Sequence, residues 1–305
     1  MPSPQPVLVI GATGFLGRSV VASLGRHGYS VRCMARTPER AADLAGDGIE
    51  IVRGDYLDAG NVERASDGVA AVIICVHTLT PQGASAAGQG FMDVEAAGLR
   101  NVVAACVAHG VRRVMYVTSI GVEENASSSW LRGRWLTEQS LFDSGLDVTV
   151  IRLGMIVGRG GDGFGIVARG ATTRFAVAMG SPRQIFRTVA VTDLADDIVD
   201  LMAQPAAVGR AFEMGSDDLL TMRQMMSVAA TSIGRRRAVT LFVPASLIRL
   251  VAPLVERIAR MPHGALRGLV GDGPRHDMIG DPTAVRAVLG RTDRPFRDSI
   301  VGELV

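Results

Sequence analysis

This chain lacks a strong net charge of either sign. Its 305 residues include 32 lysine and arginine residues against 30 acidic ones, which leaves a formal net charge of +2. A balance this even gives no field that would make nucleic acid or a membrane surface the main partner of the protein. We therefore predict that its main partner is a small molecule.

Long apolar runs are also missing. The longest stretch without Asp, Glu, Lys or Arg, 68–92, contains Pro81, Gln82 and several glycines, which a bilayer-spanning helix would not tolerate well. The first six residues carry no basic charge, and the apolar run at 7–10 is too short for a secretory signal. The sequence predicts no integral membrane association and a cytoplasmic location.

Cysteine is scarce, with Cys33, Cys75 and Cys106 only. Their odd number and their lack of metal-ligand spacing are typical of buried thiols in a reducing compartment. The tail histidines His263 and His276 have no partner at ligand spacing either. We therefore expect neither a disulfide nor a bound metal.

Short apolar runs alternate with longer alanine-rich stretches of helical spacing. The runs are nearly continuous, as in strands covered by helices on both faces, and they lie at 7–10, 30–33, 49–52, 71–76, 113–118 and 148–153. Helices are predicted between them at 18–27, 61–65, 91–108 and 134–144. The pattern predicts an α/β fold with a doubly wound parallel Rossmann sheet.

The alternation loosens after the sixth run. Residues 154–165 are rich in glycine and are predicted to form a loop over the ligand crevice. Later elements are predicted as a strand at 186–191, a helix at 193–202, an edge strand at 210–215, and helices at 222–233 and 244–261. We assign 1–157 with 184–216 to the Rossmann domain. Residues 158–183 with 217–305 form a smaller, mostly helical substrate-side lobe.

Two features of the predicted tail have more than one interpretation. Residues 241–261 are amphipathic, and we expect them to pack against the core, the alternatives being a substrate lid or a partner surface. The run Arg235-Arg236-Arg237 is interpreted as a solvated helix end, with contact to an acidic substrate as the alternative.

Glycines at 11, 14 and 17 follow the first strand and open the first helix. Gly11 permits a tight turn, Gly14 lets the backbone approach a diphosphate, and Gly17 lets the helix pack closely on the strand. Free amide groups and the positive end of the helix dipole then attract phosphate. We therefore predict that a dinucleotide binds at the segment Gly11-Ala12-Thr13-Gly14-Phe15-Leu16-Gly17.

The acidic residue that would bind the ribose 2′-hydroxyl of NAD is missing after the second strand. No Asp or Glu occurs between Gly17 and Glu39. Arg32 and Arg36 flank the strand end and could pair with a 2′-phosphate. We predict NADP(H) as the cofactor, with NAD(H) less suitable; the alternative is that Arg36 is simply a solvated arginine.

Several further segments carry a resemblance to a known family. They are Gly54-Asp55-Tyr56-Leu57-Asp58, Asn101 within 98–105, Tyr116-Val117-Thr118-Ser119, and 189–195. With the glycine turn, they make the chain similar to short-chain dehydrogenases/reductases, in the atypical and extended branch of NAD(P)H-binding, NmrA-like and epimerase-like proteins. The resemblance covers residue 7 to about residue 220.

The resemblance implies a role for several residues. Asp55 and Tyr56 would contact the adenine. Ser119 would lie beside the reacting centre, next to Thr118 as a cofactor contact. The nicotinamide ribose would be lined by Val76, His77 and Thr78.

The catalytic pair departs from the family pattern. Working enzymes of this family use Tyr-x-x-x-Lys, in which tyrosine protonates the carbonyl and lysine lowers its pKa and binds the ribose. Here the resemblance puts Trp130 at the tyrosine position and Arg134 at the lysine position. An indole N–H is too weak an acid to protonate an alkoxide, and arginine keeps its proton near neutral pH. The proton donor is therefore predicted to be missing, while Arg134 could still bind the ribose. In the alternative interpretation the alignment has slipped and neither residue faces the site.

Candidates for a replacement acid are His77 after the fourth strand, Ser119 after the fifth, and the loop serines at 127–129. Side chains at the carboxyl ends of parallel strands face the ligand crevice, and histidine titrates near neutral pH, so His77 is the best placed. Its alternative role is a hydrogen-bonded histidine at a strand end. The predicted catalytic residues are His77, Ser119 and Arg134.

Three functions fit these predictions. The first is an NADPH-dependent oxidoreductase that reduces a small hydrophobic ketone, enone or quinone-like substrate. The second is a non-catalytic NADP(H)-binding sensor or structural protein, similar to NmrA-like regulators. The third is a redox-neutral isomerase or dehydratase with a bound cofactor. The sequence favours the first and leaves open whether the protein is a monomer or a homodimer.

Overall fold

A seven-stranded sheet forms the centre of the computed structural model, which describes residues 5–76, 90–126, 128–259, 264, 266 and 277–304. Its order is β10-β6-β5-β4-β1-β2-β3, and all neighbouring strands are parallel. The strands are β1 (Val7–Ile10), β2 (Val31–Ala35), β3 (Ile49–Arg53), β4 (Ala71–Ile74), β5 (Arg113–Ser119), β6 (Asp147–Leu153) and β10 (Arg210–Glu213). This confirms the predicted doubly wound Rossmann sheet.

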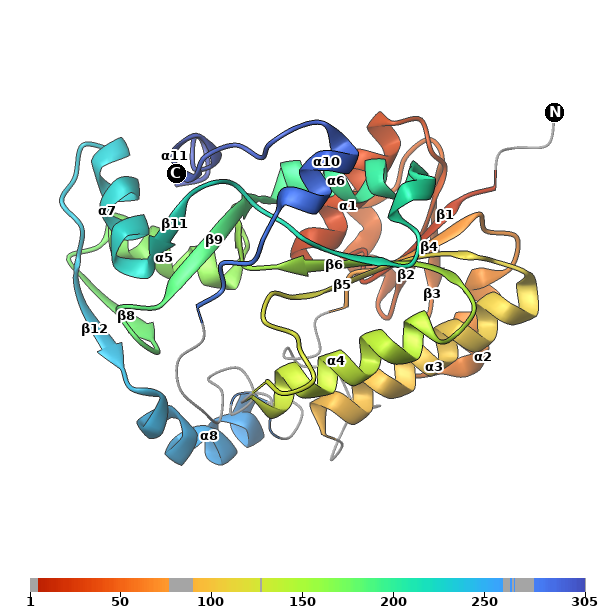
Figure 1. Cartoon of the computed structure of the whole chain (residues 1–305), viewed down its shortest axis with the longest axis horizontal. Coiled ribbons are helices and arrows are strands. Elements are labelled where there is room, and N and C mark those ends of the chain that lie inside the picture. The colour runs from red at the N-terminus through yellow and green to blue at the C-terminus, as the bar shows by residue number, and fades with distance from the viewer. Residues whose placement is uncertain are drawn as a thin grey trace.

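Helices cover both faces of the sheet (Figure 1). One face carries α1 (Phe15–Arg26) and α6 (Val191–Ala203), and the other carries α2 (Ala59–Ser66), α3 (Phe91–His109) and α4 (Ser129–Phe142). Within β1, Val9 packs towards α1 and α6, whereas Leu8 and Ile10 pack towards α3. Because both faces are buried, every position of the strand is apolar.

Helices α1 and α4 begin three and five residues earlier than the sequence predicts. Helix α1 starts at Phe15, directly after the glycine turn. Helix α4 starts at Ser129, because the side chain of Ser128 accepts a hydrogen bond from the backbone N–H of Leu131. Trp130 and Arg134 therefore lie one turn apart on the same helix. A short 3₁₀ helix, η1 (Pro38–Leu44), follows β2.

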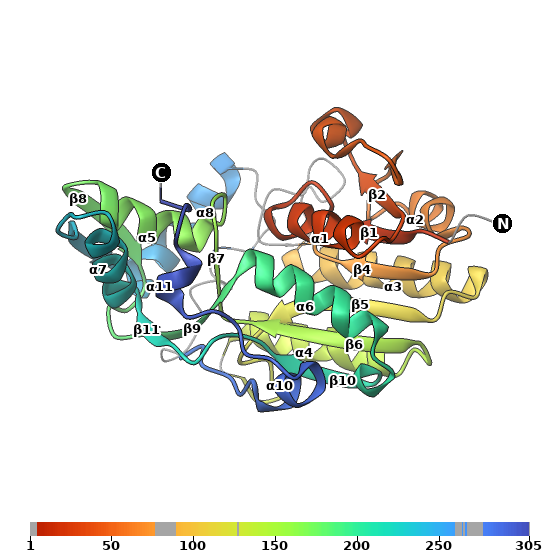
Figure 2. The ribbon, with the colours of Figure 1, turned by 90° about the horizontal axis from the view of Figure 1, so that it is seen from above.

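The prediction of a loop over 154–165 is wrong. Strand β7 (Met155–Val157) pairs with β9 (Ile185–Ala190), and helix α5 (Asp162–Thr172) follows, which leaves 158–161 as the connection. The glycine content of this stretch suggested a loop, but Phe164, Val167 and Ala171 are buried at helical spacing. Figure 2 shows β7 and β9 leading from the central sheet towards α5.

The tail beyond Thr221 is mostly helical, as predicted, but it also contains a strand that the sequence does not predict. Strand β12 (Val239–Val243) pairs in parallel with β8 (Phe175–Met179), and β11 (Leu219–Thr221) pairs with β9. The helices of the tail are α7 (Met222–Ser232), α8 (Ala245–Ala259), α10 (Thr283–Leu289) and α11 (Phe296–Ser299). Strand β12 has five residues and its partner β8 is far away in sequence. A segment this short gives no periodic signal strong enough to predict a strand.

A separate core holds α5, α7 and α11 together around Phe164, Met225 and Phe296. The three-stranded sheet β11-β9-β7 lies between this core and the central sheet. Strands β9 and β11 pair with each other, although the predicted domain boundary at 216/217 separates them. The division of the chain into two domains therefore stays a prediction. In the described part of the chain no helix is long and apolar enough to cross a membrane.

Candidate functional site

The turn between β1 and α1 has no room for a side chain at Gly11 or Gly17. Gly11 has a φ of +88°, and a Cβ there would lie 2.9 Å from the main chain of Cys75. A Cβ on Gly17 would lie 2.0 Å from the carbonyl oxygen of Gly11. The backbone N–H of Gly14 donates to that same oxygen at 3.0 Å. Glycine is therefore required where the turn folds back under the start of α1.

The first turn of α1 is open to an anion. Its N-cap is Gly14, so no side chain accepts from the first backbone N–H groups, and the turn contains no acidic residue. Arg18 fixes the turn from the side: its guanidinium donates to the carbonyl oxygen of Thr13 at 3.2 Å and pairs with Asp43 of η1. Free amides at a helix N-terminus fit a diphosphate, so the residues present fit a dinucleotide cofactor.

The connection between β7 and α5 lies directly against this turn. A Cβ at Gly158 or Gly161 would come within 3.1 Å of the Phe15 ring, so the glycines make room for that ring. Phe15 thus packs under residues 158–161. This contact places residues 158–161, which connect β7 to α5 within the predicted loop at 154–165, beside the glycine turn.

Of the two arginines predicted to pair with a 2′-phosphate, Arg32 lies at the wrong end of the sheet. Arg32 is the second residue of β2, at the amino end of the sheet, and it pairs with Glu50 at 2.6 Å and donates to the carbonyl oxygens of Ala65 and Asp67. The prediction for Arg32 is therefore wrong. Arg36 directly follows β2 at the carboxyl end, where its side chain is exposed.

The segment after β3 is held by its neighbours. The Oδ1 atom of Asp55 accepts from the backbone N–H of Leu57 at 3.0 Å, and Asn101 donates to the carbonyl oxygen of Tyr56 at 3.2 Å. The Tyr56 ring is buried against Gly98, and its hydroxyl donates to the carbonyl oxygen of Glu95. An adenine contact by Asp55 and Tyr56 stays a prediction, and for Tyr56 it would have to use the main chain.

Arg134 lies in a buried polar cluster between α3, α4 and β5. Its guanidinium donates to Glu95 Oε2 at 3.2 Å and to Thr118 Oγ1 at 3.1 Å, and Glu95 also accepts from the hydroxyl of Tyr116. The guanidinium lies 5.0 Å from the centre of the Trp130 ring, a cation–π distance. Trp130 and Arg134 are thus neighbours at the carboxyl end of β5, as the family alignment implies. Both are largely buried.

The cluster keeps its charges paired. Burial by itself would lower the pKa of Arg134, but the negative charges around it, that of Glu95 first, raise the pKa overall, so the side chain stays protonated. Burial, followed by the charge of Glu95, raises the pKa of Tyr116 and of Tyr56 well above the ordinary value. Both tyrosines are buried, and the hydroxyl of each already donates to Glu95.

The third tyrosine of the chain, Tyr29, precedes β2 at the amino end of the sheet. The tyrosines therefore offer no acid at the carboxyl end. Ser119 is the last residue of β5, and its hydroxyl donates to the carbonyl oxygen of Ile120 at 3.2 Å. Val76 follows β4 and is half-buried. The predicted residues His77, Thr78, Ser127, His263 and His276 lie outside the described residues.

Sequence reasoning missed the two buried acids of this region. Glu95 lies within the buried stripe of α3, and Glu138 on α4 pairs with Arg152 of β6 at 2.5 Å. Burial raises the pKa of Glu138 and Arg152 opposes that effect. An acidic residue at an apolar helix position is a usable signal, because it needs a buried partner.

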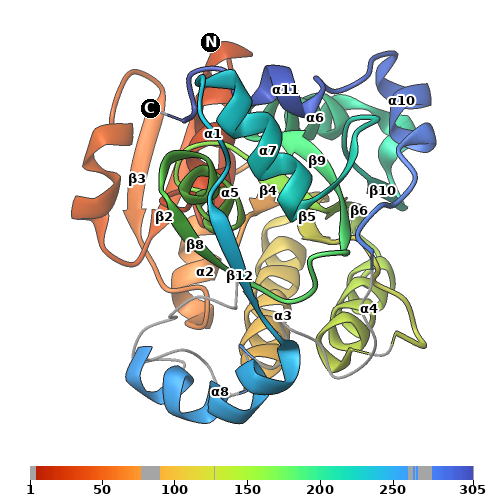
Figure 3. The same ribbon diagram turned by 90° about the vertical axis from the view of Figure 1, so that its left-hand side faces the viewer.

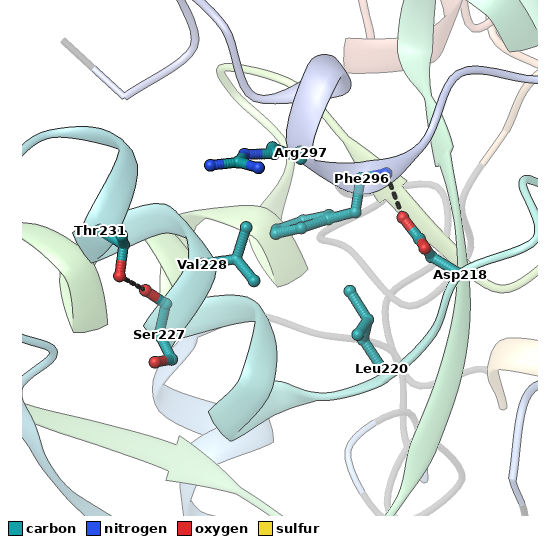
Figure 4. Close-up of a pocket in the computed structure, with 7 residues that line it drawn as sticks. All are labelled: Asp218, Leu220, Ser227, Val228, Thr231, Phe296 and Arg297. Atoms are coloured by element: carbon teal, nitrogen blue, oxygen red, sulfur yellow. Dashed lines mark hydrogen bonds between the residues drawn. The ribbon is translucent and has the colours of Figure 1, made fainter.

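A cavity of about 290 Å³ lies elsewhere, between α7, β11 and α11 (Figure 4). The Phe296 ring forms part of its wall, and Asp218 accepts from the backbone N–H of Phe296 at 2.6 Å. These residues belong to the separate core around α5 and α7. The cavity is therefore not part of the nucleotide site.

The comparisons with known proteins agree with the geometry of the turn. The model of the NAD(P)H-binding family matches residues 11–205. The chain is 30% identical to the (4-alkanoyl-5-oxo-2,5-dihydrofuran-3-yl)methyl phosphate reductase of Streptomyces griseus, over 96% of this chain and 95% of that protein. It is 31% identical to the photosystem II assembly factor Ycf39 of Cyanophora paradoxa, over 48% of this chain and 44% of that protein.

The fold is shared with solved structures. One is the NADPH-dependent quinone oxidoreductase QOR2 of Escherichia coli, complexed with NADPH, with a TM-score of 0.70 and 20% identity. The alignment covers 97% of this chain and 99% of that one.

Proposed function

The chain belongs to the NAD(P)H-binding family, among the atypical short-chain dehydrogenases/reductases, and on that premise we propose that it is an NADPH-dependent reductase of small hydrophobic enones, quinones or ketones. The observation that carries the proposal is the open first turn of α1 behind Gly11, Gly14 and Gly17, at the carboxyl end of a parallel sheet. The full-length similarity to a named reductase supports the reaction class.

The preferred cofactor in this proposal is NADP(H). Arg36 follows β2, at the place where the ribose of a bound dinucleotide lies in this fold, and no acidic residue precedes Glu39 there. A planar guanidinium suits a 2′-phosphate, and an acid would suit the 2′-hydroxyl of NAD.

The missing tyrosine narrows the substrate class. A bound NADPH supplies hydride, and the protein must hold the substrate and stabilise the oxyanion that develops. Reduction of an unactivated ketone leaves a strongly basic alkoxide, which needs a positioned acid. Reduction of an enone or quinone leaves a delocalised anion, which water can protonate. With both Tyr56 and Tyr116 buried beside Glu95, the electron-poor acceptors are favoured, and Ser119 is the proposed hydrogen-bond donor.

A substrate panel tests this proposal. The purified chain is mixed with NADPH and with para-quinones, unsaturated lactones, or unactivated ketones, and loss of the reduced-nicotinamide absorbance is followed. We expect turnover with the first two classes and much slower turnover with the ketones. A preference for unactivated ketones would overturn the argument from the missing acid.

A second candidate is a non-catalytic NADP(H)-binding protein. It is favoured by the terminal guanidinium nitrogens of Arg134, which already donate to Glu95, Thr118 and the carbonyl oxygen of Val117, so that only the buried Nε atom has no partner among the described residues. The relative Ycf39, named as an assembly factor, shows that the family is not limited to proteins named as enzymes. Tight NADPH binding without turnover across the whole panel would select this candidate.

A further inference from the structure

Helix α8 presents its apolar side to solvent. Six large apolar residues at helical spacing are exposed along it, and they are Leu247, Leu250, Val251, Leu254, Val255 and Ile258. Leu250 is 76% exposed and Ile258 is 74% exposed. The acid of the helix, Glu256, is instead buried and accepts from the backbone N–H groups of Gly264 and Leu266. Of the apolar side chains of α8, Ile248 and Ala252 are buried in a small cluster with Leu266, whereas most of its large apolar residues face the solvent, unlike the usual apolar stripe that faces the core.

The two-stranded sheet that leads into α8 is also apolar on its outer side. Phe175 pairs with Val239, and Val177 pairs with Leu241, and all four side chains are exposed. The alternate residues of β8, Ala176 and Ala178, are buried. Figure 3 looks onto the end of the molecule where β8, β12 and α8 meet. We call the exposed apolar residues of these three elements the apolar end. Exposed apolar side chains that gather on neighbouring elements mark an interaction site.

The segments that build the apolar end are basic, although the whole chain is nearly neutral. In 163–192 and 219–259 together the only acidic residue is Glu256, whereas ten arginines occur. Arg174 precedes β8, Arg236 and Arg237 precede β12, and Arg257 lies on α8, and all four are exposed. The apolar end is therefore bordered by positive charge.

We propose that the apolar end docks on the surface of a lipid bilayer that carries anionic headgroups. A helix with one apolar side and arginines beside it lies in the interfacial plane, where its apolar side enters the acyl boundary and its cations meet the headgroups. Arginine is suited to this position because its stem is apolar and its guanidinium binds phosphate. The association is peripheral and requires no spanning helix.

A second copy of the chain fits this surface less well. A twofold contact through α8 would bring Arg257 and the arginines before β12 of one copy towards the same residues of the other. Like charges across a closed contact are unfavourable, and the segments offer no acid except the buried Glu256. The charge pattern thus favours an anionic surface.

Vesicle sedimentation tests the proposal with the whole chain. The probes are vesicles of phosphatidylcholine alone and of phosphatidylcholine with phosphatidylglycerol. We expect binding to the anionic vesicles to be about tenfold or more tighter than to the neutral ones, and to weaken with added salt. The double variant Leu250→Glu with Ile258→Glu should lose binding by about a hundredfold, because two charges replace inserted side chains.

A matched control is Val107→Glu. Val107 on α3 is 63% exposed, as is Leu254 on α8, but it lies outside the apolar end, so its replacement should leave vesicle binding unchanged. NADPH binding by each variant checks that the fold is intact. Equal vesicle binding by the wild type and the double variant would overturn the proposal. The proposal would also fail if the wild type sedimented as a dimer and bound no vesicles, and the double variant sedimented as a monomer.

A label gives a second measurement if the double variant does not fold. Leu254→Cys can carry an environment-sensitive fluorophore, because Cys33 and Cys106 are buried and burial raises the pKa of Cys75 to about 12. The emission should shift to the blue on anionic vesicles. Emission that stays as in water while the protein binds would place the contact elsewhere and contradict the proposal.

Discussion

Two glycines of α1 meet opposite surroundings. A Cβ at Gly17 would collide with the carbonyl oxygen of Gly11 at 2.0 Å, whereas a Cβ at Gly25 would meet nothing within 4 Å. We predict that Gly17→Ala abolishes NADPH binding and lowers the free energy of unfolding by about 1–3 kcal/mol, because the turn must move. Gly25→Ala, the matched control, should raise it by about 0.5–1 kcal/mol and leave NADPH affinity unchanged. Urea unfolding and nucleotide titration measure both; NADPH binding that survives in the first variant would disprove our account of the turn.

Arg36 is the residue on which the choice of cofactor depends. Arg36→Ala should weaken NADPH affinity by about tenfold to a hundredfold, since a charge-assisted contact to phosphate is lost, and should change NADH affinity little. Arg112→Ala is the control, because Arg112 pairs with Asp147 at 2.9 Å at the amino end of the sheet. Isothermal titration with both nucleotides measures the difference. Equal losses for NADPH and NADH would remove the argument for a 2′-phosphate contact.

Helices α3 and α4 are joined by the buried pair Glu95–Arg134, whose side chains are only 3% and 4% exposed. Removing one partner leaves the other charge unpaired in the interior. We therefore predict that Glu95→Leu lowers the free energy of unfolding by about 3–5 kcal/mol, measured by urea denaturation. Adding Arg134→Met should restore much of the loss, because the stranded charge is then gone. A double variant less stable than Glu95→Leu would show that the arginine acts through other contacts, such as Thr118.

The same pair connects α4 to the carboxyl end of β5. Arg134 holds Thr118 at the end of β5, next to Ser119, and stacks near Trp130. The terminal nitrogens of this cation are turned towards Glu95 and Thr118, while Arg134 Nε and Trp130 Nε1 are buried without a hydrogen-bond partner among the described residues.

At the scale of the whole molecule, the end of the chain returns to the Rossmann sheet and is held by ion pairs. Arg291 pairs with Asp197 and Asp200 of α6, and Arg294 pairs with Asp193. Asp197 is buried, and burial followed by the nearby carboxyl of Asp293 raises its pKa to about 8, against the effect of Arg291. The attachment of the tail is therefore sensitive to pH.

The sign of that dependence follows from proton uptake. Asp197 titrates near pH 4 in the unfolded chain, so between about pH 4 and pH 8 the folded protein binds more protons, and the free energy of unfolding falls as pH rises through this window. Asp197→Asn cannot titrate and should flatten the curve, by an amount on the order of a few kcal/mol across the window. Urea unfolding at several pH values compares the two proteins. Parallel curves would show that another group causes the dependence.

The sequence alone determined the central sheet and the nucleotide turn. The inner strands β1 and β4, covered on both faces, are apolar at every position, and a turn that packs against its own helix needs glycine, so both leave marks within a few residues. These features depend on neighbours in sequence.

The tertiary structure decided what depends on distant partners. It paired β8 with β12 and made strands where glycine or helical spacing suggested otherwise. It engaged Arg32 with Glu50, turned Arg134 towards Glu95, and set the apolar side of α8 outwards, against the expectation of core packing. An amphipathic pattern states that a helix has an apolar side, but only the packing of the other elements determines whether that side meets the core or the solvent.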